Sequence, residues 1–133
     1  MLLKAVAVLL LSMWIPFAVA DEGDDEEYVG YVELKPFVAN FGETSQLHFV
    51  KCEITIQAGS SATEQAIGNH IAAIRNDILF LLMSQSEENM SSVSAQKILA
   101  KKAILLVKQR LADEGDEETT QVTDLFFVSF VAQ

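Results

Sequence analysis

The chain has 133 residues, half of them hydrophobic, and a formal net charge of −10 at pH 7. This acidic balance, with no basic patch interleaved with aromatic residues, argues against nucleic-acid binding and against direct adsorption to anionic lipid. The length suits one domain with a single hydrophobic core. Cys52 is the only cysteine, so no disulfide can form within the chain. Free cysteines are usually buried, and we expect Cys52 in the core.

The first 20 residues are expected to export the protein. Lys4 precedes an unbroken apolar run, and residues 18–20 have the small-x-small form that a signal peptidase accepts. Pro16 breaks any helix in this segment, which is also shorter than the about 20 apolar residues that span a bilayer. Cleavage after Ala20 is therefore favoured, and an uncleaved signal-anchor is the alternative. The acidic run at 21–27 is expected to be a solvated spacer.

Residues 28–133 are predicted to form an exported domain that begins with two strands. Residues 28–34 are rich in Tyr and Val, Pro36 kinks this strand or places it at a sheet edge, and the extended pattern resumes to residue 41. Residues 42–46 indicate a hairpin loop, followed by a strand at 47–57. The core face of the second strand is expected to carry Val50, Cys52, Ile54 and Ile56.

Two helices follow in the predicted order. The first spans about 62–83, after a Ser61-x-x-Glu64 capping box. Its apolar stripe consists of Ile67, Ile71, Ile74, Ile78, Leu81 and Leu82. The second helix spans about 95–112, with Ser92 or Ser94 as its N-cap and Gly115 as its stop signal. Its apolar side consists of Leu99, Ala103, Leu106, Val107 and Leu111.

The last element, from Val122 to Gln133, carries bulky apolar residues on both faces of the expected strand. A strand that is apolar on both faces is usually covered on both, which predicts a central, buried strand. The chain is therefore expected to adopt an α+β fold. In this fold a small sheet of three to four strands, with a kinked first strand and a buried C-terminal strand, packs against two helices.

No sequence pattern nominates an enzyme, a metal site or a cofactor. The chain lacks a Gly-x-Ser-x-Gly elbow, a Gly-rich phosphate loop and paired histidines at a helical metal spacing. We interpret His48 and His70 as structural residues, because no ligating residue accompanies either at a convincing spacing. The acidic runs at 21–27 and 113–118 lack the regular alternation of a calcium loop. A solvated spacer is the preferred interpretation of both runs, and a cation site is the alternative.

A partner-binding surface can be proposed on the two helices. Phe80 lies off the apolar stripe near the end of the first helix. Lys97, Lys101 and Lys108 share the side of the second helix that lies opposite its apolar residues. These four residues are the candidates for binding a protein partner, and an ordinary solvated helix face is the alternative for the lysines.

Three segments resemble those of a known family. Residues 31–41 (Tyr-Val-Glu-Leu-Lys-Pro-Phe-Val-Ala-Asn-Phe) look like its kinked opening strand. Residues 74–82 contain an Arg-x-x-Ile step before paired leucines, and residues 122–133 form an apolar strand that closes on a C-terminal Gln. In this order the segments are similar to those of the flagellar basal-body-associated FliL proteins.

The resemblance implies a domain on the periplasmic side of the bacterial inner membrane, with a stomatin-type α+β fold. It further implies a non-enzymatic role without a cofactor: association with flagellar stator and basal-body proteins, support of motility, swarming or surface sensing, and assembly into homo-oligomeric rings. Typical members carry a full transmembrane anchor, whereas the apolar segment here is short, so membrane association would come through this segment or through partners. The alternative function is that of a soluble periplasmic binding protein for a cation or small ligand.

Overall fold

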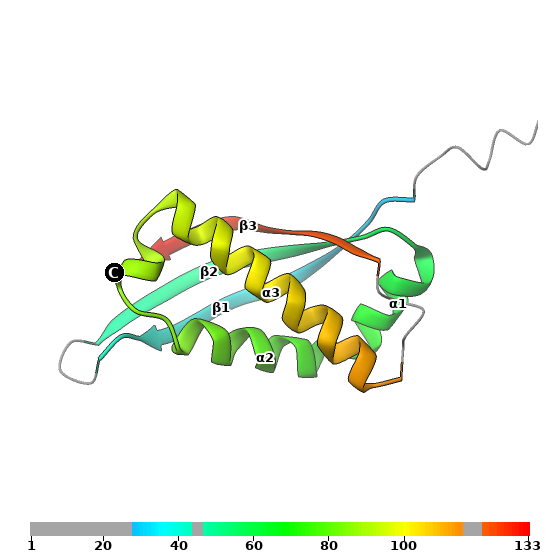
Figure 1. Ribbon diagram of the computed structural model, residues 1–133, viewed down its shortest axis with the longest axis horizontal. Coiled ribbons are helices and arrows are strands. Elements are labelled where there is room, and N and C mark those ends of the chain that lie inside the picture. The colour runs from blue at the N-terminus through cyan, green and yellow to red at the C-terminus, as the bar shows by residue number, and fades with distance from the viewer. Residues whose placement is uncertain (1–27, 44–46, 116–120) are drawn as a thin grey trace, which may run out of the picture.

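The computed structural model describes residues 28–43, 47–115 and 121–133. Within them, one antiparallel sheet has the strand order β1-β2-β3, and all helices lie on one of its faces (Figure 1). The strands are β1 (Gly30–Phe41), β2 (His48–Ala58) and β3 (Val122–Ala132). The helices are α1 (Ser61–Asn69), α2 (Ile71–Met83), the short 3-10 helix η2 (Glu88–Met90) and α3 (Val93–Asp113). The predicted α+β class is confirmed, whereas the expected signal segment and acidic spacer lie outside the described residues.

The core lies between the sheet and the helices, as the periodic patterns predicted. The core face of β2 is formed by Val50, Cys52, Ile54 and Ile56, each at most 1% exposed. The opposing helix residues are also buried: Ile67, Ile74, Ile78, Leu82, Leu99, Ala103, Val107 and Leu111. Alternation in β2 identified its core row correctly, and the helical stripes identified most of the helix residues in the core. Three residues of the expected stripes, Ile71, Leu81 and Leu106, are only half-buried.

The single helix expected at 62–83 is two helices. His70 ends α1 and begins α2 with φ −112° and ψ 21°, outside the helical region. Gly68 and Asn69, both poor helix formers, directly precede the break. The N-cap of α1 is Ser60 rather than Ser61, since the Ser60 side chain accepts a 3.1 Å hydrogen bond from the amide of Thr63. The apolar stripe continues through the break, which is why periodicity alone did not reveal it.

The ends of α3 agree with their sequence signals. The Ser92 side chain accepts a 3.0 Å hydrogen bond from the amide of Ala95, so the predicted cap is confirmed as Ser92. Gly115 has a φ of +83°, a left-handed conformation that suits glycine just after a helix. Its amide donates to the carbonyl of Ala112 and ends α3 close to the predicted position.

The prediction of a buried, central C-terminal strand is wrong. β3 lies at one edge of the described sheet and pairs with β2 alone. Only Val122 and Leu125 are buried in it, whereas Phe126, Val128 and Val131 are exposed. The apolar residues on its second face point away from the helices, toward a face of the sheet that no described element covers.

Candidate interaction surfaces

Arg75 of α2 joins the helix layer to the kink of β1. The pairing register of β1 with β2 shifts between Leu34 and Phe37, so the intervening residues have no regular partner in β2. The Arg75 guanidinium donates to the carbonyl of Lys35 at 2.6 Å and to that of Pro36 at 3.3 Å. It also lies over the buried Phe37 ring, 4.3 Å from the centroid. One side chain thus satisfies the two carbonyls that the bulge leaves outside the β-ladder.

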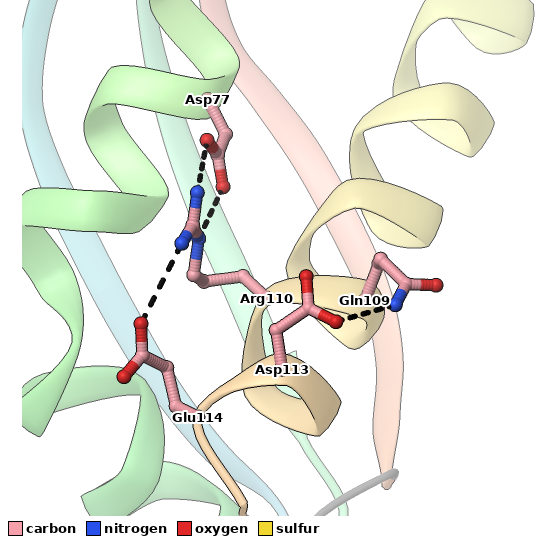
Figure 2. Close-up of polar contacts among 5 residues, drawn as sticks. All are labelled: Asp77, Gln109, Arg110, Asp113 and Glu114. Carbon is pink, nitrogen blue, oxygen red and sulfur yellow. Dashed lines mark hydrogen bonds and ion pairs between the residues drawn. The ribbon is translucent and has the colours of Figure 1, made fainter.

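A second polar contact fixes α2 against α3. In Figure 2 the guanidinium of Arg110 meets both carboxylate oxygens of Asp77, with nitrogen–oxygen distances of 2.7 and 2.8 Å. Glu114 lies 3.5 Å from the same guanidinium, one turn further along the chain. The hydrogen bond and charge of Asp77 raise the pKa of Arg110 further above its ordinary value. This bidentate geometry sets the rotation of both helices, because a guanidinium fork pairs with a carboxylate in one plane.

The predicted partner-binding residues fall on different surfaces. Lys97 and Lys101 are exposed and line a groove of about 440 Å³ between α3 and β3. Phe80 is 60% exposed on α2, and neither it nor Lys108 lines this groove. The structure therefore brings two of the four candidates together. The groove is completed by residues that the sequence did not nominate: Val93, Gln96, Ala100, Ile104, Asp124, Leu125, Phe126 and Phe127.

The two histidines lie among packing and helix-junction residues. The His48 ring stacks on that of Phe41 with 5.5 Å between centroids, and its Nε2 lies 3.5 Å from a Glu87 carboxylate oxygen. His70 occupies the junction of α1 and α2. In the described part of the chain, no three His, Cys, Asp or Glu side chains are grouped to hold a metal ion.

The thiol of Cys52 is fully buried in the core row of β2, as expected. Its removal from water disfavours the thiolate and raises the pKa of Cys52 to about 12. A thiol in this environment stays protonated at neutral pH and reacts slowly. Cys52 is therefore a packing residue.

These features define a two-layer α+β domain with an open sheet face and a groove beside one sheet edge. Within the described residues, no helix combines the length and hydropathy needed to cross a bilayer. A family model described as "Flagellar basal body-associated protein FliL" matches residues 31–133. The chain therefore belongs to the FliL family, which makes it a flagellar basal body-associated accessory protein. Among curated proteins, no match to the chain was found.

Proposed function

We propose that the protein is a non-enzymatic accessory of the flagellar motor that associates with stator units and supports motility or swarming. The observation that carries this proposal is the family match over residues 31–133, which covers all but the first residue of the described strands and helices. The three segments with family resemblance correspond to β1, the C-terminal part of α2, and β3. Arg75 connects the first two of these segments through the bulge of β1.

We also propose where the domain resides and how its copies assemble. The domain resides on the periplasmic side of the inner membrane, the signal is cleaved after Ala20, and several copies form a ring around the motor. In support of a surface for assembly, the uncovered face of the sheet carries exposed apolar residues on all three strands: Tyr31, Val38, Phe49, Phe126, Val128 and Val131. Exposed apolar residues in such number on one face are typical of association surfaces.

Phe80, Lys97, Lys101 and Lys108 remain the proposed partner-binding residues. Phe80 is an exposed aromatic side chain on a helix, and aromatic residues of this kind often anchor protein interfaces. Phe80→Ser and Lys101→Glu are expected to weaken association with the partner without unfolding the domain, because both side chains point to solvent.

Deletion of the gene tests the function directly. Swimming and swarming are expected to be impaired while filaments still assemble, and the intact gene supplied in trans should restore both behaviours. Unchanged motility in both assays would contradict the proposal. A parallel strain that carries Phe80→Ser tests the proposed surface against the same background.

A further inference from the structure

The two edges of the described sheet differ in how they are protected. At the β1 edge, a bulge, Pro36 and the contact from Arg75 interrupt any regular pairing with another strand. β3 contains neither proline nor lysine, and it is rich in β-branched and aromatic residues. Its outer edge has no strand partner among the described residues. An edge of this composition is a template for the addition of another strand.

A hydrogen bond within β3 shows how one of its amides is satisfied. The amide of Leu125 donates to the carboxylate of Asp124, its own neighbour in the chain, at 2.8 Å. This amide therefore takes a side-chain acceptor in place of a strand carbonyl. The Asp124 carboxylate can rotate away from this amide. A backbone carbonyl of an added strand can then accept the hydrogen bond in its place.

The groove beside this edge combines an apolar lining with positive charge. Ala100, Ile104 and Phe127 are half-buried and offer apolar surface, whereas Lys97 and Lys101 are exposed at the same groove. Neither lysine has a carboxylate within ion-pair distance in the described part of the chain. The helix α3 holds five of the nine Lys and Arg residues of a chain whose net charge is −10. The surface of α3 is therefore positively charged although the chain as a whole is acidic, and this surface favours an acidic partner.

The arrangement of α3 over the sheet explains why the groove lies at this edge. The first half of α3 passes over β3, while its second half lies against α2, where Arg110 meets Asp77 (Figure 1). Lys97 and Lys101, in the first half of α3, therefore lie beside the edge of β3. A strand added to β3 would have one row of side chains facing the groove.

We propose that an extended segment of a partner protein adds to β3 as a further strand, with apolar residues in the groove and acidic residues against Lys97 and Lys101. The inference deepens the proposed function, on which it rests for placing the partner at the flagellar basal body. Main-chain hydrogen bonds to the edge would supply affinity. The groove and the two lysines would select apolar and acidic side chains within the one row of the added strand that faces the helices, at every second residue.

The test measures binding of a fluorescent peptide of about eight residues to the full-length protein. Val and Glu alternate along the row of the peptide that faces the groove, and Thr occupies the intervening positions. Saturable binding below about 1 mM is expected. The same peptide with alternate amides N-methylated should not bind, because it cannot donate to the edge of β3. Slower hydrogen exchange of the amides at 124–127 upon binding of the unmodified peptide would locate it on this strand.

Two variants on adjacent residues provide the matched comparison. Lys101→Glu reverses a charge at the groove and should weaken binding about tenfold, whereas Lys102→Glu makes the same change at an exposed residue outside the groove and should alter binding less than about threefold. Equal effects of the two variants, equal binding of the methylated peptide, or no saturation would overturn the proposal. Occupation of the edge by a second copy, seen as self-association that Lys101→Glu abolishes and the peptide does not displace, would also overturn it.

The inference and the proposed function can fail separately. Loss of motility on deletion of the gene, combined with no peptide binding, would reject the edge site and leave the motor role standing. Normal motility on deletion, combined with specific peptide binding, would reject the motor role and leave a strand-binding protein with another partner.

Discussion

Removal of Arg75 should destabilise the domain more than its partly exposed position on α2 suggests. Arg75→Ala leaves the carbonyls of Lys35 and Pro36 without their donors and removes the cation from the Phe37 ring. Two hydrogen bonds to a charged donor at a partly exposed site contribute about 1 kcal/mol each, and the cation–π contact about 0.5–1 kcal/mol. The expected loss of unfolding free energy is therefore about 2.5–3 kcal/mol.

Urea denaturation followed by circular dichroism measures this loss. With a slope of about 1–1.5 kcal/mol per molar urea for a chain of this size, the midpoint should fall by about 2 M. Arg75→Lys keeps the charge without the planar fork and should recover less than half of the stability. Lys102→Ala, at an exposed residue of α3, should change the free energy by less than about 0.5 kcal/mol. An Arg75→Ala midpoint within error of the Lys102→Ala midpoint would refute this role of the guanidinium.

Three further predictions concern the caps, the buried thiol and the helix pair. Ser60→Ala should cost about 1 kcal/mol of unfolding free energy and Ser61→Ala much less, because Ser60 caps α1; equal costs in urea melts would contradict this. Burial raises the pKa of Cys52 to about 12, so its contribution to stability should decline as the pH rises from about 9 to 12, where the unfolded thiol ionises first. Cys52→Ala should remove that decline from the pH profile of stability. Asp77→Arg and Arg110→Asp should each lower the melting temperature, and the double variant should melt above either single variant.

Local patterns predicted most of the core but not the environment of β3. The alternation in β2 and the apolar stripes of the helices show which side of each element faces the core. Both patterns can be recognised within a short stretch of sequence. The run of apolar residues at Leu125–Val128 predicts burial on both faces. Whether a further strand or layer covers such a run is decided by elements far away in the chain, which the run itself does not specify.

Local sequence patterns also could not predict the polar contacts that hold the elements of the fold together. Arg75 was recognisable as part of a family-like segment, yet its partners are carbonyls freed by a bulge about 40 residues earlier. Asp77 and Arg110 lie 33 residues apart and meet only once α2 and α3 have packed. The same holds for the candidate site. The sequence predicts Lys97 and Lys101 as binding residues, but it does not show that apolar residues of β3 lie beside them.

Crosslinking in living cells tests the motor role most directly. After a mild crosslink, the protein is purified from solubilised membranes, and the proteins that accompany it are identified. Enrichment of flagellar stator subunits, reduced by Phe80→Ser or Lys101→Glu, is the expected result. Recovery only from the soluble periplasmic fraction, with no flagellar motor protein attached, would contradict the role in the motor.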